Sequence, residues 1–308
     1  MRILVTGVSG FVGARLVPRL QREGHEVRGF ARDPARVALD VPLVVGDAVG
    51  GDGLAEALDG IDVAYYLIHS MEPAPAGEEA AFDARERRAA ERFAAAARAA
   101  GVVRIVYLGG LLPSAARPSA HLASRLAVER VLLDAVPGSL ALRASIVIGA
   151  RSRSFRFLVR LVERLPLLAL PPWRARHTQP IDERDVIELL ARAAGAERLA
   201  GRSLDVGGPD VVTYGELVER IRDALLLRRP SLRLPRATPP AVVASRLAAA
   251  VGGERHELVG PLMAGLGTDL LPRDDRAAHE LGVRLHELDA AIEHALGEWE
   301  REEPLAAR

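Results

Sequence analysis

Three glycines near the N-terminus form the pattern best suited to bind a ligand. The segment Thr6-Gly7-Val8-Ser9-Gly10-Phe11-Val12-Gly13 reads Thr-Gly-x-x-Gly-x-x-Gly and directly follows the apolar residues Ile3 to Val5. In such a turn the first glycine allows tight curvature, the second lets the backbone approach a pyrophosphate, and the third lets the next helix pack closely. Backbone amides at the start of that helix face the anion. We therefore expect this turn to bind the phosphates of a dinucleotide.

A second pair of residues has the chemistry to move a proton. His121 and Arg125 are four positions apart in a stretch with helical spacing, so both side chains would lie on one helix face. Histidine titrates near pH 6.5 and needs little tuning to act as an acid or base. Arginine supplies charge and hydrogen bonds but cannot give up its proton. The alternative is that His121 lies on a surface turn and Arg125 only binds a ribose.

Apolar runs of strand length alternate with helical stretches over the first half of the chain. We predict strands at residues 3–5, 26–31, 43–45, 63–67, 105–108 and 139–147. We predict intervening helices at residues 14–22, 53–58, 77–100 and 119–135. This alternation is typical of the α/β class, and the expected fold is a Rossmann-type doubly wound parallel sheet. Ligands of such sheets bind beyond the carboxyl ends of the strands.

The pattern changes after Gly149, which predicts a second and smaller lobe. We assign residues 1–150 to the dinucleotide-binding domain, with 177–208 returning to it. Residues 151–176 and 209–308 form the smaller, mostly helical C-terminal lobe, which would bind a substrate or partner. Within it, 155–170 is apolar enough to line a substrate pocket. Core packing is the default for such a stretch, and contact with a membrane surface or a protein partner is a further alternative.

The end of the second predicted strand distinguishes NADP from NAD. An NAD site places an acidic residue there for the ribose 2′-hydroxyl, whereas an NADP site offers arginine to a 2′-phosphate. This chain has Ala31 followed by Arg32. Arginine can bind a phosphate through two parallel hydrogen bonds. The predicted cofactor is therefore NADP rather than NAD. Arg36 is a second candidate, and we expect Asp33 to open a turn with Pro34.

Bulk properties exclude several classes of function. The 41 basic residues balance 41 acidic ones, which argues against a general affinity for nucleic acid. All 41 basic residues are arginines, and the chain contains no lysine, asparagine or cysteine. Without cysteine there is no thiolate chemistry, and no histidine has metal-ligand spacing, so no metal is expected. Since no apolar run approaches the roughly 18 residues of a membrane span and no signal peptide is apparent, we expect a cytoplasmic protein.

Residues 1–225 resemble the atypical branch of the extended short-chain dehydrogenase/reductase superfamily, which includes NmrA-like proteins and the nucleotide-binding accessory subunit of respiratory complex I. Besides the glycine turn, the motifs are Gly46-Asp47, Val106-Tyr107-Leu108-Gly109-Gly110, Arg143, Gln179-Pro180-Ile181-Asp182-x-x-Asp185-Val186 and Gly207-Gly208-Pro209-x-x-x-Thr213-Tyr214. The resemblance implies that Asp47, with Ala48 beside it, lies near the adenine; a simple turn carboxylate is the alternative. We also expect Leu67 and Gly109 to border the cofactor from the strand ends.

The chain departs from this family where the chemistry occurs. Members with reductase activity use a serine after the fifth strand and a Tyr-x-x-x-Lys pair on the following helix. Here Gly109-Gly110 replaces the serine, while His121 and Arg125 stand in the places of tyrosine and lysine. His69, after the fourth strand, is another catalytic candidate, although a histidine there is as often a wall residue.

Two hypotheses for the function follow. The first is an NADP(H)-binding oxidoreductase that acts on a small apolar carbonyl or quinone-like substrate with a non-standard active site. The second is a non-catalytic protein that binds NADP(H) for redox sensing or for structure. The fold alone does not choose between them.

Overall fold

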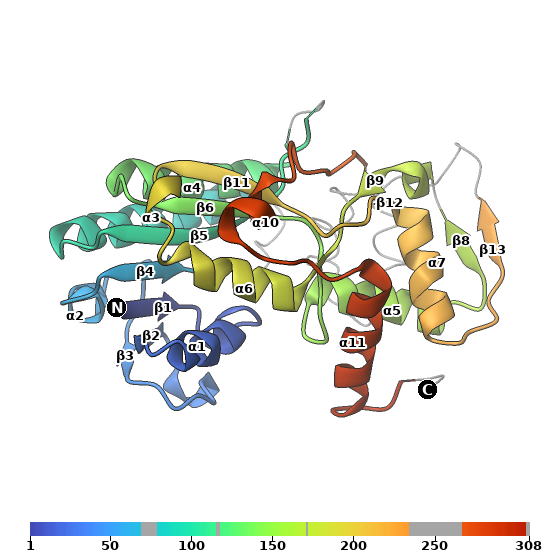
Figure 1. The fold of residues 1–308 in the computed structure, drawn as a ribbon, viewed down its shortest axis with the longest axis horizontal. Coiled ribbons are helices and arrows are strands. Elements are labelled where there is room, and N and C mark those ends of the chain that lie inside the picture. Colours follow the sequence, from blue (N-terminus) through green and yellow to red (C-terminus); the bar gives the residue numbers. More distant parts are fainter. Residues whose placement is uncertain (69–78, 115–117, 171, 234–266, 306–308) are drawn as a thin grey trace.

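Seven parallel strands form the central sheet of the chain (Figure 1). A computed structural model describes residues 1–68, 79–114, 118–170, 172–233 and 267–305. The strands are β1 (Arg2–Thr6), β2 (Glu26–Ala31), β3 (Leu43–Val45), β4 (Val63–Tyr66), β5 (Arg104–Gly110), β6 (Leu140–Ala144) and β11 (Arg202–Val206). Their order is β11-β6-β5-β4-β1-β2-β3. Because β1 pairs with β2 on one side and β4 on the other, the order reverses at β1, where such sheets bind ligands.

Helices cover both faces of this sheet, because side chains alternate along each strand. On one face Ile3 and Val5 pack with α1 (Gly13–Arg22), α6 (Glu183–Ala193) and α10 (Arg276–Leu281). On the other face Leu4 packs with α2 (Leu54–Leu58), α3 (Glu79–Ala99) and α4 (Ala120–Ala135). The predicted fold class, a doubly wound Rossmann-type sheet, is therefore confirmed.

A separate apolar core lies beside the sheet. It is built mainly by α5 (Arg153–Arg164), α7 (Tyr214–Ala224) and α11 (Leu288–Glu300). Short strand pairs complete this region: β7 (Val147–Ile148) with β10 (Ile181–Asp182), β9 (His177–Thr178) with β12 (Val212–Thr213), and β8 (Leu168–Leu170) with β13 (Ser231–Arg233). Apolar side chains of residues 155–170, among them Phe155 and Val159, are buried in this core. The division into two domains stays a prediction, and α10, from the range assigned to the smaller lobe, packs on the sheet core.

One predicted strand differs from the structure. The predicted strand 139–147 is two strands: β6 belongs to the sheet, and β7 leaves it to pair with β10. Helix α6 begins at Glu183, because Ile181 and Asp182 are extended and the Asp182 side chain accepts the Arg184 amide as a helix cap. Three short 3₁₀ turns connect other elements: η1 (Pro34–Arg36), η2 (Pro172–Ala175) and η3 (Glu197–Leu199).

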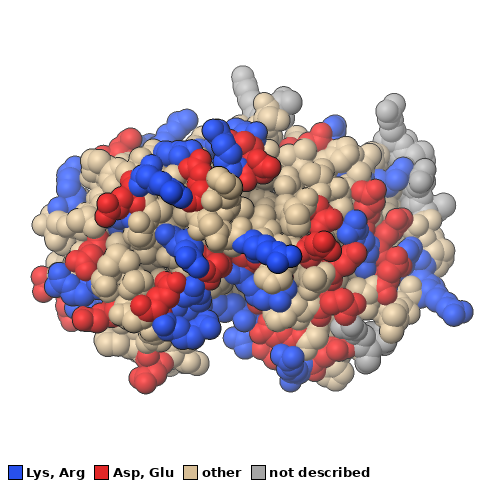
Figure 2. All heavy atoms as spheres, in the orientation of Figure 1, with Lys and Arg blue, Asp and Glu red and all other residues tan. Residues whose placement is uncertain are grey.

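The described surface carries charges of both signs. On the face in Figure 2, arginines and acidic residues are interspersed over the described part of the chain. Among the described helices, none has the length and apolar character that crossing a membrane requires.

Candidate functional site

The glycine turn connects β1 to α1. At each of its three glycines, an added Cβ would come close to a backbone carbonyl oxygen. Gly7 has a φ of +67°, and a Cβ there would lie 2.7 Å from the Leu67 carbonyl oxygen. A Cβ on Gly10 would lie 3.0 Å from the Gly7 oxygen, and one on Gly13 would overlap that oxygen. Val12 precedes α1 without capping it through a side chain, and the amides of Ala14 and Arg15 donate to the backbone carbonyls of Gly10 and Val12 at 3.0 and 3.1 Å. The turn therefore fits the pyrophosphate of a dinucleotide.

Thr6 supports this turn from beneath. Its side chain is fully buried, and its hydroxyl donates to the Tyr65 carbonyl at 2.9 Å and accepts the Leu67 amide at 3.0 Å. Thr6 thus ties the end of β1 to the end of β4. Ser9 and Gly10 are exposed on the turn, and Phe11 is half-buried. Because its hydroxyl is engaged by these two backbone groups, Thr6 would affect a bound cofactor indirectly, by fixing the positions of Leu67 and of the glycine turn.

Arg32 lies exposed directly after β2, at the same edge of the sheet as the glycine turn. The next residue, Asp33, caps the 3₁₀ turn η1, because its carboxylate accepts the Ala35 amide at 3.0 Å. The predicted structural role of Asp33 is confirmed. Arg36 ends η1 and is exposed. The arginine side chains on this segment therefore face solvent, where a ribose phosphate could reach them.

Asp47 follows β3, and its side chain forms hydrogen bonds within the turn that it begins. Its carboxylate accepts the amides of Val49 at 3.3 Å and Gly50 at 3.0 Å. Ala48 beside it is buried against the sheet core. The carboxylate is thus the turn carboxylate that the sequence left as an alternative, and its predicted proximity to an adenine stays a prediction.

The end of β5 faces the start of α4. Gly110 lies opposite Leu122 and Arg125: a Cβ on it would be 3.1 Å from Leu122 Cδ2 and 4.0 Å from Arg125 Nε. Arg125 Nη2 donates to the Leu108 carbonyl at 2.8 Å, so its guanidinium lies at the carboxyl end of the sheet. His121 is half-buried one turn earlier on α4. The predicted pair therefore occupies one face of α4 beside the strand ends.

A buried ion pair supports the same strand ends. Arg143 of β6 donates to Glu129 of α4 through Nε at 2.9 Å and Nη2 at 2.6 Å. Both residues are at least nine-tenths buried. Ser203 of β11 also donates to Glu129, at 2.6 Å, and Asp205 lies 3.7 Å from Arg143 Nη1. A Cβ on Gly109 would lie 3.6 Å from the Glu129 carboxylate, so this network lies directly beside the end of β5.

A cluster that the sequence did not reveal lies at the start of α6. Arg15 Nη2 is 2.5 Å from Glu298 Oε1 and 3.2 Å from Glu183 Oε1. Burial raises the pKa of Glu183 to about 8, and nearby Glu298 adds to the rise against the opposing effect of Arg15. These residues come from α1, α6 and α11, so only the folded chain brings them together.

Known proteins match this chain over the region just described. A model of the NAD(P)H-binding family matches residues 7–135, from the glycine turn to the end of α4. A 2-alkyl-3-oxoalkanoate reductase of Stenotrophomonas maltophilia is 29% identical over 289 residues, 90% of this chain and 78% of that protein. The mitochondrial NADH dehydrogenase [ubiquinone] 1 alpha subcomplex subunit 9 of Arabidopsis thaliana is 26% identical over 79% of this chain. The match spans 62% of that protein, which is less than two thirds of its length.

These matches confirm the resemblance to short-chain dehydrogenase/reductases that the sequence motifs predict. The fold agrees: the solved structure of MoeE5 in complex with UDP-glucose and NAD has a TM-score of 0.72 and 21% identity, and covers 98% of this chain and 99% of that one. The coarser part of the cofactor prediction, an NAD(P)-binding domain, is thereby confirmed.

The non-standard active site stays a prediction. By the resemblance, Gly109 and Gly110 would stand at the serine position after β5, and His121 and Arg125 at the positions of tyrosine and lysine. The other catalytic candidate, His69, lies outside the described residues. The catalytic roles of these three residues stay predictions.

The ionisation of His121 gives a prediction for stability. Burial lowers its pKa from 6.5 to about 4, and Arg125 on the same helix lowers it further while Asp83 of α3 opposes both. As the pH falls from 7 to 5 the unfolded chain gains a proton at this site and the folded chain does not, so the free energy of unfolding decreases. We expect this site to contribute about 2 kcal/mol of that decrease. Urea denaturation at both pH values should show a weaker pH dependence for His121→Gln.

A matched variant controls for the loss of a histidine as such. His279 is exposed on α10, away from α4. His279→Gln should leave the pH dependence as in the unmodified protein. An unchanged pH dependence in His121→Gln would contradict the neutral state of this half-buried ring.

Proposed function

We propose that this protein is an NADP(H)-dependent oxidoreductase that acts on a small, apolar carbonyl or quinone-like substrate. The observation that carries the proposal is the glycine turn, in which backbone atoms leave no room for a side chain at Gly7 and Gly13 and little room at Gly10. The turn is followed by a helix start without a side-chain cap. Such a turn suits a close approach of phosphate oxygens to backbone amides.

Arg32 supports NADP as the cofactor. It is exposed after β2, where the superfamily binds the adenosine ribose, and the neighbouring carboxylate of Asp33 is engaged in its own turn. A guanidinium can bind a 2′-phosphate through two hydrogen bonds, and an acidic residue for the 2′-hydroxyl is absent at Ala31.

Arg125 and His121 support a role for α4 in the chemistry. A bound nicotinamide supplies or accepts a hydride. Arg125 at the carboxyl end of β5 would hold positive charge and donate hydrogen bonds to a ribose. With its lowered pKa, His121 is neutral at pH 7, so its ring could accept a proton when an alcohol is oxidised, whereas reduction of a carbonyl would take its proton from water or another donor. The name of the Stenotrophomonas relative, a reductase of 2-alkyl-3-oxoalkanoates, supports a carbonyl on an apolar chain as the substrate class.

The cofactor preference is tested by thermal stability. Because a ligand that binds only the native state stabilises it, NADPH should raise the melting temperature more than NADH at equal concentration. Arg32→Ala should remove most of that difference. Arg87→Ala, at an exposed ion pair with Glu91 on α3, is the matched control and should retain it. Equal shifts with both nucleotides in the unmodified protein would refute the preference for NADP.

A second function, NADP(H) binding without catalysis, is favoured by the glycines at the serine position and by the low pKa of His121. The two functions are distinguished by NADPH oxidation measured against a panel of carbonyl and quinone compounds. Turnover of one compound class supports the oxidoreductase. Binding of NADPH without turnover across the panel supports the binding protein.

A further inference from the structure

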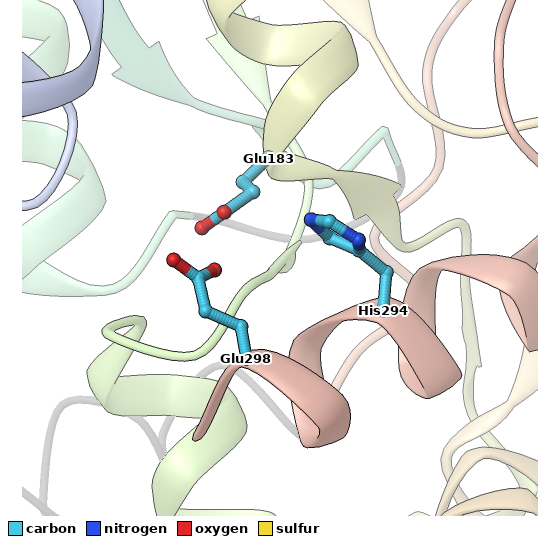
Figure 3. Close-up of side chains that lie close together, drawn as sticks. All are labelled: Glu183, His294 and Glu298. Carbon is cyan, nitrogen blue, oxygen red and sulfur yellow. The ribbon is translucent and has the colours of Figure 1, made fainter. Parts of the chain in front are cut away.

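Three side chains from two helices that are far apart in the sequence converge beside the glycine turn. Glu183 is the first residue of α6, and His294 and Glu298 lie on α11 (Figure 3). One carboxylate oxygen of each glutamate and one ring nitrogen of His294 all lie within 4.8 Å of one another. Residues four apart share one face of a helix, so α11 presents both of its side chains toward Glu183.

The carboxylates of this cluster are incompletely satisfied. Glu183 is 2% exposed. Arg15 approaches Oε1 of both glutamates, at 2.5 Å for Glu298 and 3.2 Å for Glu183. Oε2 of each glutamate is buried and has no hydrogen-bond partner. Because a buried carboxylate oxygen without a partner is unfavourable, these two atoms point to a further ligand.

Gly149 provides the space that Glu183 uses. A Cβ on Gly149 would overlap Oε2 of Glu183 and lie 2.8 Å from the ring of Phe11. Phe11 belongs to the glycine turn, so the cluster lies against the back of that turn. A side chain at Gly149 would displace the Glu183 carboxylate from the cluster.

The charge of the cluster favours a cation as the ligand. Coordination of a cation would require both glutamates in their ionised form, in which two carboxylates face one arginine, Arg15, and a neutral imidazole adds no charge. One excess negative charge then remains in a largely buried place. A small cation would compensate it and coordinate both free Oε2 atoms.

We propose that Glu183, His294 and Glu298 bind one divalent transition-metal ion of the Zn²⁺ or Mn²⁺ type. Two carboxylates and one imidazole are ligands that these ions accept, whereas Mg²⁺ prefers oxygen ligands and retains its water. The ion would join α11 to α6 and thereby fix the C-terminal helix to the helix that covers the sheet. Since residue 183 is far from 294 and 298, no local spacing in the sequence announces this site.

The test is calorimetric titration of the full-length, chelator-treated protein with ZnCl₂, MnCl₂ and MgCl₂ at pH 7. We expect one Zn²⁺ or Mn²⁺ per chain and weaker binding of Mg²⁺. His294→Ala should weaken Zn²⁺ binding by about 100-fold or more, since loss of an outer-shell group alone costs about 10–100-fold. His279→Ala, an exposed histidine outside the cluster, should bind as the unmodified protein does.

Two further measurements keep the result interpretable. Circular dichroism checks that His294→Ala is folded, and Glu298→Gln, which keeps the size of the side chain, should lose binding as well. No uptake by the unmodified protein, or equal uptake by His294→Ala, would overturn the proposal and leave a proton shared between the two carboxylates. The readout is metal binding, so either result leaves the proposed cofactor and reaction untouched.

Discussion

Gly13→Ala is expected to weaken NADPH binding by about 100-fold. The new Cβ would overlap the carbonyl oxygen of Gly7, so the turn and the start of α1 must move apart. Loss of two charge-assisted hydrogen bonds from amides to phosphate, at roughly 1.5 kcal/mol each, corresponds to about two orders of magnitude in affinity. Equilibrium titration with NADPH measures the change directly.

A second glycine provides the control for this substitution. Gly297 lies within α11, and a Cβ there would meet nothing within 4 Å. Gly297→Ala should bind NADPH as before and gain up to about 1 kcal/mol of stability, because alanine favours the helix. If Gly13→Ala bound NADPH with unchanged affinity, the glycine turn would not be the phosphate site.

Glu129→Gln should lower the free energy of unfolding by roughly 3 kcal/mol, because it leaves the buried guanidinium of Arg143 without its main charged partner. Arg143 is 7% exposed and Glu129 is 3% exposed, so water cannot replace the lost interaction. Asp205, at 3.7 Å, compensates only in part. Urea denaturation at pH 7 measures the loss.

The exposed pair on α3 is the matched control for this loss. Arg87 and Glu91 are four residues apart, with side chains 64% and 49% exposed. Glu91→Gln should change the stability by about 0.5 kcal/mol or less, as for other surface ion pairs. Equal effects of Glu91→Gln and Glu129→Gln would contradict the importance of burial for the Arg143 pair.

The sequence predicts those helices, strands and turns that are determined by neighbouring residues in the chain. The alternation of apolar runs and helical stretches predicts the parallel sheet, and the spacing of Gly7, Gly10 and Gly13 predicts the turn where their lack of a Cβ is needed. Asp33 before Pro34 predicts a cap, which η1 confirms. Each of these signals depends on a few neighbouring residues.

Structural features that depend on contacts between residues far apart in the sequence cannot be predicted from local sequence patterns. The apolar run at 139–147 contains no signal for the point where the chain leaves the sheet, because partner β10 is supplied much later in the sequence. Likewise, in the sequence Glu183 is an ordinary acidic residue at the start of a helix. Only the fold places Glu298 and His294 of α11 beside it. The turn bonds of Asp47 also depend on how residues 47–52 fold back.

We propose that the glycine turn and Arg32 together form an NADP(H) site. Isothermal titration of the unmodified protein with NADPH and with NADH tests it most directly. We expect one nucleotide per chain and at least about tenfold tighter binding of NADPH, since a bidentate phosphate contact contributes more than about 1.4 kcal/mol. If neither nucleotide bound, the glycine turn would not be a dinucleotide site. If NADH bound as tightly as NADPH, Arg32 would not select NADP.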